Sequence, residues 1–255
     1  MRPSRFLRTS LVLLAFAVFC GLLLEQERRF SRRVKPSPPP EIKLLGWRSV
    51  EEFPAGLAQF ETVFWDPRDT VSLRALIRQS PEIVRGRRVL EIGSGTGLLS
   101  LCCLKAGAQN VVATDINPAA IANTAYNADH WKLSAGLQTR LVSRDRPDAF
   151  AVVGREEKFD VILSNPPWEN QRPEAIADYA LYDENFRLLE TLLAGLQNHL
   201  RPGGRAFLAY GCVEAIKTII ERAPRYGLRV SVLDERKLDE LEPVFLPGMM
   251  LEVTR

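Results

Sequence analysis

From about Gly86 onward, short runs of β-branched and apolar residues alternate with longer stretches of helical character. Strands that alternate with helices form a mostly parallel sheet with helices on both faces. The expected strands are RRVLEIG, NVVATDI, LQTRLVS, FDVILS, GRAFLAY, LRVSVLD and a final MMLEVTR. A long amphipathic helix is predicted over residues 179–200, where an RPGG turn follows. The pattern therefore predicts an α/β fold.

The length and composition suit one ordinary domain with an extension. The 255 residues are 46% hydrophobic and 25% charged, which are globular values, and no internal repeat is present. Residues 1–40 hold 8 Lys and Arg against 2 Asp and Glu, whereas residues 41–255 hold 26 against 29. A mildly acidic body is a poor electrostatic match for long nucleic acid.

The N-terminal segment carries an uncharged apolar run, LVLLAFAVFCGLLL at residues 11–24, with arginines on both sides. Extended back to residue 6, the run is long enough to span a bilayer, and no small-residue cleavage site follows it. We expect a single-pass membrane anchor over residues 6–24, with the body facing the cytoplasm because of the basic residues that follow. A cleaved signal peptide and an organellar presequence are the alternatives.

The expected organisation has four parts. Residues 1–34 are the hydrophobic anchor with its basic flanks, and residues 35–41, KPSPPPE, are a stiff Pro-rich linker. Residues 42–85 are an N-terminal helical cap segment, and residues 86–255 are the main domain. The four cysteines have no C-x-x-C spacing, so no metal site is predicted.

A glycine cluster, VLEIGSGTGLLSL, joins the first strand of the main domain to the helix that follows. Gly93, Gly95 and Gly97 let the backbone turn while a ligand approaches closely. The spacing G-x-G-x-G differs from the dinucleotide fingerprint G-x-G-x-x-G, which disfavours a nicotinamide-dependent oxidoreductase. Glu91, just before the glycines, suits a cationic amino-acid end rather than a phosphate.

Two further acids follow the next two strands. Asp115 ends its strand where a carboxylate can accept both hydroxyls of a ribose. Asp145 follows LQTRLVS, where it can reach an adenine amino group, although a solvated loop carboxylate explains it as well.

The stretch SNPPWE ends the strand FDVILS, and its two prolines stop the strand ladder. The side-chain oxygen of Asn165 and the carbonyl of Pro166 can each accept one hydrogen from a planar NH2 group. Pro166 and Pro167 fix the backbone. Trp168 is expected to stack on the flat face of an amide or a base.

The conjunction of E-x-G-x-G-x-G, an acid after the second strand and N-P-P-W after the fourth resembles class I S-adenosylmethionine-dependent methyltransferases. Within that class the chain is similar to the N-P-P-[YFW] branch, which includes HemK-type protein-glutamine methyltransferases and small methyltransferase domains that modify RNA bases. The resemblance covers residues 63–255 and includes VFWDPRDTVSLRALI, a segment that helps to cover the cofactor in that branch.

The resemblance implies a Rossmann-like, seven-stranded, mostly parallel sheet whose last strand is antiparallel. It also implies that S-adenosylmethionine lies across the carboxyl ends of the strands. Carried over residue by residue, Glu91, Gly93, Gly95 and Gly97 hold the methionine part, Asp115 the ribose and Asp145 the adenine. The implied acceptor-side residues are Asn165, Pro166 and Trp168.

The predicted function is S-adenosylmethionine-dependent N-methylation of a planar NH2 group, and the expected acceptor is the glutamine amide of a protein or a small molecule. An RNA or DNA base N-methyltransferase is the alternative, because adenine N6 and guanine N2 also present a planar NH2. From another class, a catalytically inactive, membrane-tethered binding protein is the competing hypothesis.

Overall fold

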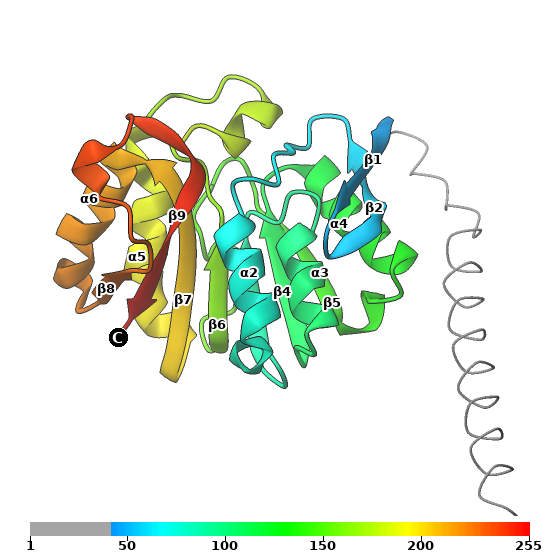
Figure 1. Cartoon of the computed structure of the whole chain (residues 1–255), viewed down its shortest axis with the longest axis horizontal. Coiled ribbons are helices and arrows are strands. Elements are labelled where there is room, and N and C mark those ends of the chain that lie inside the picture. The colour runs from blue at the N-terminus through cyan, green and yellow to red at the C-terminus, as the bar shows by residue number, and fades with distance from the viewer. Residues whose placement is uncertain (1–41) are drawn as a thin grey trace, which may run out of the picture. The chain divides into compact units, whose positions relative to one another are not determined.

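A seven-stranded sheet organises residues 42–255, the part of the chain that the computed structural model describes (Figure 1). Its strand order is β5-β4-β3-β6-β7-β9-β8, and only β9 runs antiparallel to its neighbours. The strands are β3 (Arg88–Ile92), β4 (Asn110–Asp115), β5 (Leu137–Leu141), β6 (Phe159–Ser164), β7 (Leu200–Cys212), β8 (Arg229–Val232) and β9 (Val244–Thr254). The expected Rossmann-like α/β fold with one antiparallel strand is confirmed.

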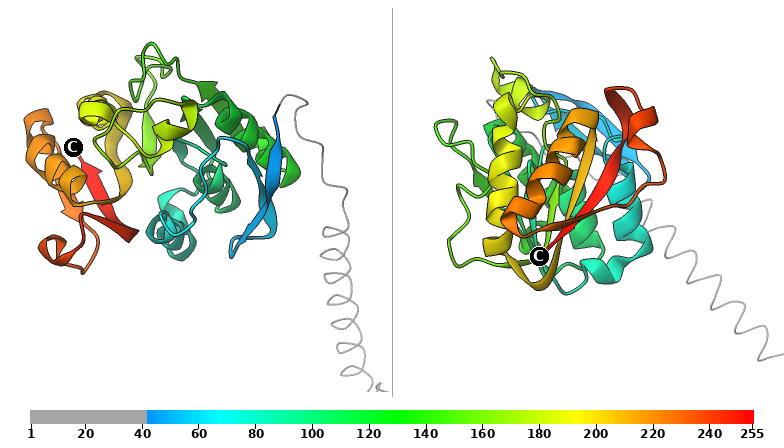
Figure 2. Two further views of the ribbon diagram at one scale, coloured as in Figure 1. Left: turned by 90° about the horizontal axis from the view of Figure 1, so that it is seen from above. Right: turned by 90° about the vertical axis from the view of Figure 1, so that its left-hand side faces the viewer.

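Helices cover both faces of this sheet (Figure 2). Alternate residues of each central strand point to opposite faces, so Val89 packs with the helices of one face and Leu90 with those of the other. The first face carries α2 and α3, and the second carries α5 and α6. The helices are α2 (Val71–Gln79), α3 (Leu98–Lys105), α4 (Pro118–His130), α5 (Arg187–His199) and α6 (Val213–Arg222).

The segment before α2 opens with a β-hairpin, not with the expected helix. Strands β1 (Leu44–Val50) and β2 (Phe53–Phe60) pair antiparallel. Side chains of α4 accept hydrogen bonds from backbone N–H groups along the free edge of β2. Asn127 Oδ1 accepts from the Ala58 N–H at 2.8 Å, and Asn123 Oδ1 accepts from the Phe60 N–H at 2.9 Å. Two side-chain amides thus replace a third strand, which local propensity alone does not reveal.

Helix α5 begins eight residues later than the sequence pattern predicts. Asn185 and Phe186 adopt left-handed backbone conformations, with φ of 57° and 53°, which a continuous helix excludes. Asp183 then accepts hydrogen bonds from two backbone N–H groups of the first helical turn, at 2.8 and 3.0 Å. The residues before Arg187 instead form a connection with two short 3-10 turns, Ile176–Ala180 and Glu184–Phe186, which reaches over the carboxyl edge of the sheet.

The prediction of a single-pass membrane protein is corrected. Among residues 42–255, none of the helices combines the length and the apolar character that crossing a membrane requires. The apolar run that suggested the anchor, the membrane partner and the cytoplasm-facing orientation falls at residues 6–24, outside the described residues. The boundaries predicted at residues 34, 41 and 85 stay predictions.

Candidate active site

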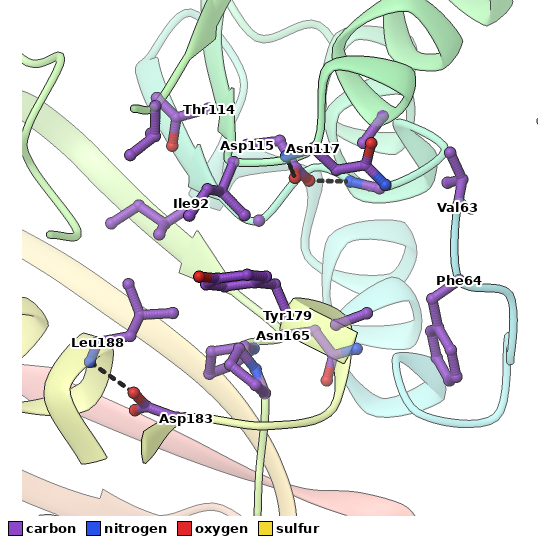
Figure 3. Close-up of a pocket in the computed structure, with 18 of the residues that line it drawn as sticks. Val63, Phe64, Ile92, Thr114, Asp115, Asn117, Asn165, Tyr179, Asp183 and Leu188 are labelled. Atoms are coloured by element: carbon purple, nitrogen blue, oxygen red, sulfur yellow. Dashed lines mark hydrogen bonds between the residues drawn. The ribbon is translucent and has the colours of Figure 1, made fainter. Parts of the chain in front are cut away.

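A cavity of about 330 Å³ opens at the carboxyl ends of β3, β4 and β6 (Figure 3). The chain runs from β3 outward to β4 and β5, and then returns to place β6 on the other side of β3. This reversal is the topological switch point at which open α/β sheets bind their ligands. The size is within the range of small-molecule sites.

The glycine loop forms the floor of the cavity at the end of β3. Gly93, Gly95 and Gly97 all have positive φ, at 79°, 53° and 84°. A Cβ at Gly97 would lie 2.9 Å from the Thr124 side chain, so α4 approaches too closely for any larger residue. Gly95 has nothing within 4 Å of such a Cβ, and its backbone is left open toward the cavity.

Asp115 lines the cavity at the end of β4, beside the glycine loop (Figure 3). Its carboxylate accepts from the Gly95 N–H at 2.9 Å and from the Asn117 N–H at 2.8 Å, one on each oxygen. Burial raises the pKa of this carboxyl, and the backbone hydrogen bonds partly offset the shift. Each oxygen keeps a lone pair, so the group could still accept a pair of hydroxyls.

Glu91 also lines the cavity, deeper in β3, where only 2% of its surface is exposed. Its carboxylate accepts from the backbone N–H of Ser100 at 2.9 Å and from the Ser100 hydroxyl. These bonds tie the strand to the first turn of α3. Burial raises the pKa of Glu91 to about 8, so the free protein favours the neutral acid at pH 7. A cationic group in the cavity would favour the carboxylate.

Asn165, directly after β6, lies on the opposite wall (Figure 3), and Pro166 lines the cavity next to it in the chain. The Asn165 side-chain oxygen is buried and has no hydrogen-bond partner in the described structure. An acceptor that is buried and unsatisfied is rare in folded proteins, because it has lost its water without compensation. The oxygen is therefore available to a donor that enters the cavity.

Trp168 does not lie where the sequence predicts. Its indole is absent from the cavity wall and packs against Gly211 and Gly248, where added Cβ atoms would meet the ring at 2.3 and 3.3 Å. The indole N–H donates to the Ala209 carbonyl of β7 at 3.1 Å. The expected stacking role of Trp168 is wrong in this structure, because the ring anchors the N-P-P-W loop to the sheet.

Asp145 is likewise outside the cavity. Its side chain is exposed, and its backbone N–H bonds to the Ser143 hydroxyl at 3.3 Å. The wall next to it is made by the buried apolar residues Val142 and Ala149, and Asp148 is the acid that lines the cavity there. The expected adenine contact of Asp145 is therefore not supported, and the solvated-loop alternative describes it better.

Tyr179 is a cavity residue that the sequence analysis missed. It lies in a 3-10 turn, Ile176–Ala180, and projects between Asp115 on one side and Asn165 on the other in Figure 3. The Arg144 guanidinium lies 5.7 Å from the centre of its ring. The residue was hidden because the pattern assigned it to the start of a surface helix.

The loop after β2 closes a further side of the cavity with Phe64 and Asp66. Thr62 begins this loop with a φ of 66°, which is strained for a β-branched residue. The Asn117 side chain holds it by donating to the Thr62 carbonyl at 2.9 Å. Asn117 thus couples this loop to the turn that follows Asp115.

These residues fit S-adenosylmethionine. A buried acid at one end suits the amino group of the methionine part, and a carboxylate with spare lone pairs suits the ribose hydroxyls. Apolar walls suit an adenine ring, and the unsatisfied Asn165 oxygen suits a hydrogen-bond donor on a methyl acceptor.

Comparisons with known proteins agree with this geometry. The model of the methyltransferase small domain family matches residues 61–223. The release factor glutamine methyltransferase of Cereibacter sphaeroides is 32% identical over 229 residues, which cover 78% of this chain and 78% of that protein. The tRNA1(Val) (adenine(37)-N6)-methyltransferase of a Flavobacteriaceae bacterium is 32% identical over 118 residues, 45% of this chain and 46% of that protein.

Among solved structures, the T. thermophilus 16S rRNA N2 G1207 methyltransferase in complex with AdoMet and guanosine has a TM-score of 0.53 at 21% identity. The match covers 86% of this chain and 52% of that chain, and it shows a shared fold. The chain therefore belongs to the methyltransferase small domain family, as an S-adenosylmethionine-dependent methyltransferase with an N-P-P-W motif.

Proposed function

We propose that this enzyme methylates the side-chain amide of a glutamine in a protein. The observation that carries the proposal is the buried Asn165 oxygen, which has no partner within the described residues, at the acceptor end of the cavity. The inactive, membrane-tethered alternative is dropped, because the chain belongs to an enzyme family.

The chemistry of the acceptor follows from the wall formed by Asn165 and Pro166. Two carbonyl-type oxygens on rigid backbone can accept both hydrogens of one planar NH2 group. This arrangement turns the nitrogen toward the cavity and stabilises positive charge as it develops on that nitrogen. When bound, S-adenosylmethionine would supply an electrophilic methyl group and depart as the neutral thioether. The amide nitrogen would lose one of its two protons to solvent as its bond to the methyl carbon forms. The remaining task of the protein is to hold the nitrogen at close range and to exclude water.

The charges around the cavity favour a protein over a nucleic acid. The wall contains six acidic residues and two basic ones: Asp66, Glu91, Asp115, Asp148, Asp183 and Glu184 against Arg144 and Arg187. Arg187 is already paired with Asp148 at 3.0 Å. Such a wall offers few unpaired basic side chains to a phosphate backbone, whose binding depends on them.

The comparisons support the same substrate class. The relative from Cereibacter sphaeroides, which this chain matches over 78% of both lengths, is named a release factor glutamine methyltransferase. Methylation of an RNA base is the second candidate, because a tRNA adenine-N6 methyltransferase is also a relative. That match covers less than half of either chain, and the acidic wall disfavours it.

The test is a transfer assay with the full-length protein and radiolabelled S-adenosylmethionine. The acceptors are a recombinant release factor of Cereibacter sphaeroides, its variant with the target glutamine changed to glutamate, and total RNA from the same organism. We expect label in the first acceptor alone, with mass spectrometry locating it on the glutamine amide. Label in RNA, with none in either protein, would overturn the proposal.

A further inference from the structure

We propose that Asp69 and Thr70, the two residues before α2, complete a binding site for a primary carboxamide. Asp69 holds the NH2 end of the Asn165 side chain so that the oxygen faces the acceptor. Thr70 donates its hydroxyl hydrogen to the carbonyl oxygen of the carboxamide. The inference rests on the proposed function and deepens it, because it names groups that recognise both ends of the amide.

Both residues lie against the N-P-P-W loop. A Cβ built on Gly248 of β9 would be 3.3 Å from the Asp69 carbonyl oxygen and 3.3 Å from the Trp168 ring. The start of α2 and the loop after β6 are therefore neighbours, although about a hundred residues separate them in the sequence. Thr70 itself lines the cavity together with Asn165.

Asp69 is a carboxylate that is only 5% exposed. Burial and the neighbouring Asp66 raise its pKa to about 6, whereas a hydrogen bond with the Asn165 side chain and the charge of Arg68 lower it. A carboxylate can only accept, so its partner on Asn165 is the NH2 group. Because the amide is planar, fixing its nitrogen also fixes the direction of its oxygen, which is the atom left without a partner.

Thr70 occupies the N-cap position of α2 but does not cap the helix. Threonine at this position normally accepts a backbone N–H of the first turn. Here the side chain makes no such bond, and its hydroxyl oxygen is buried without a partner. A buried hydroxyl that makes no hydrogen bond to the helix or to another group is available to a ligand.

A primary carboxamide carries a hydrogen-bonding partner for each of these groups. Its two N–H groups match the Asn165 oxygen and the Pro166 carbonyl, and its own carbonyl oxygen matches the Thr70 hydroxyl. The negative charge of Asp69, transmitted through the Asn165 amide, makes the Asn165 oxygen a better acceptor as positive charge develops on the reacting nitrogen. Asp69 is thus a positioning residue whose effect is on kcat, whereas Thr70 acts on binding and hence on KM.

The experiment compares four variants in the full-length protein on the release factor acceptor. Thr70→Val removes the hydroxyl at nearly equal volume, and Thr70→Ser retains it. Asp69→Asn removes the charge. Ser72→Ala is the matched control, because its hydroxyl is also buried and unpaired but does not line the cavity. Affinity for S-adenosylmethionine and the melting temperature are measured for each.

We expect Thr70→Val to raise the acceptor KM about tenfold, with Thr70→Ser close to wild type. Asp69→Asn should lower kcat about tenfold and abolish a loss of activity that the wild type shows below about pH 6. It should have no further effect in an Asn165→Ala background, because it acts through that residue. Cofactor affinity should be unchanged in all variants.

Two results would overturn the inference. One is a wild type that methylates glutamine while Asp69→Asn and Thr70→Val behave like Ser72→Ala. The other is an equal loss of cofactor affinity and activity in both variants, which would make the pair merely structural. A wild type that labels only RNA would instead overturn the proposed function, and the carboxamide assignment with it.

Discussion

Changing Glu91 to glutamine tests whether Glu91 receives the cationic end of the cofactor. Glu91 is 2% exposed, and burial raises its pKa to about 8 in the free protein. At pH 7 the free protein therefore carries a neutral Glu91 in about nine molecules of ten. A cofactor ammonium group favours the carboxylate, so binding should release a proton.

The magnitude follows from linkage. If the bound form is fully ionised, wild-type affinity should rise about tenfold between pH 6 and 7 and about fivefold between pH 7 and 8. Binding at pH 7 should release about 0.9 proton, which titration calorimetry measures by comparing buffers of different ionisation enthalpy. Glu91→Gln should release none of this proton, and its affinity at pH 8 should be about tenfold weaker. The amino group of the cofactor titrates in both proteins, so the difference isolates Glu91.

The same residue predicts a stability change of definite sign. Folded Glu91 keeps its proton up to about pH 8, whereas an unfolded glutamate loses it near pH 4.5. The folded state binds more protons between these values, so the cofactor-free protein should lose stability as pH rises through this window, by about 4 kcal/mol at most. Glu91→Gln should remove this dependence. Equal proton release and equal pH dependence in the two proteins would refute the reasoning.

Three further substitutions test other parts of the account. Tyr179→Ala should weaken acceptor or cofactor binding about tenfold, because it removes an aromatic ring from the cavity wall, whereas Tyr179→Phe should not. Equal effects of the two substitutions on binding would contradict a role for the ring. Trp168→Phe should lower the free energy of unfolding by about 1–3 kcal/mol through the lost bond to the Ala209 carbonyl, with kcat unchanged; a drop in kcat without a change in melting temperature would restore the stacking role. Asn127→Ala should lower the free energy of unfolding, measured by urea denaturation, by about 2–4 kcal/mol. The reason is that the Asn127 side chain accepts from the Ala58 N–H and donates to the Thr96 carbonyl of the glycine loop at 2.9 Å. A loss below about 0.5 kcal/mol would contradict the role of this side chain.

Sequence reasoning located the strands well, because a buried parallel strand is a continuous apolar run. FDVILS coincides with β6, and the glycine loop and Asp115 were found from their positions at strand ends. These features are local, since a strand, its turn and the next helix are contiguous in the chain.

The features that the sequence did not predict depend on contacts between segments that are distant in the chain. Trp168 follows Pro167 directly, but the side of the loop to which it points is decided by space at Gly211 and Gly248. The β1-β2 hairpin exists because Asn123 and Asn127 on α4 satisfy its free edge. No local pattern encodes either arrangement.

On the wall of the cavity that contains Asn165, local features were likewise predictable, whereas contacts between distant segments were not. The N-P-P-W motif identified Asn165 from the sequence, whereas the proposed contact of its side chain with Asp69 requires the start of α2 to lie against that loop. Tyr179 was assigned to a helix that in fact begins only after Phe186. Polar groups brought together by the tertiary fold are therefore the part of a site that sequence patterns leave out.

The central claim is that the unpaired oxygen of Asn165 orients a glutamine amide for methylation. The most direct test is a single-turnover assay of full-length wild type and Asn165→Ala on the release factor acceptor, with cofactor affinity measured in parallel. We expect Asn165→Ala to bind S-adenosylmethionine as the wild type does and to transfer the methyl group at least about a hundredfold more slowly. Methyl transfer to glutamine at an unchanged rate would contradict the account.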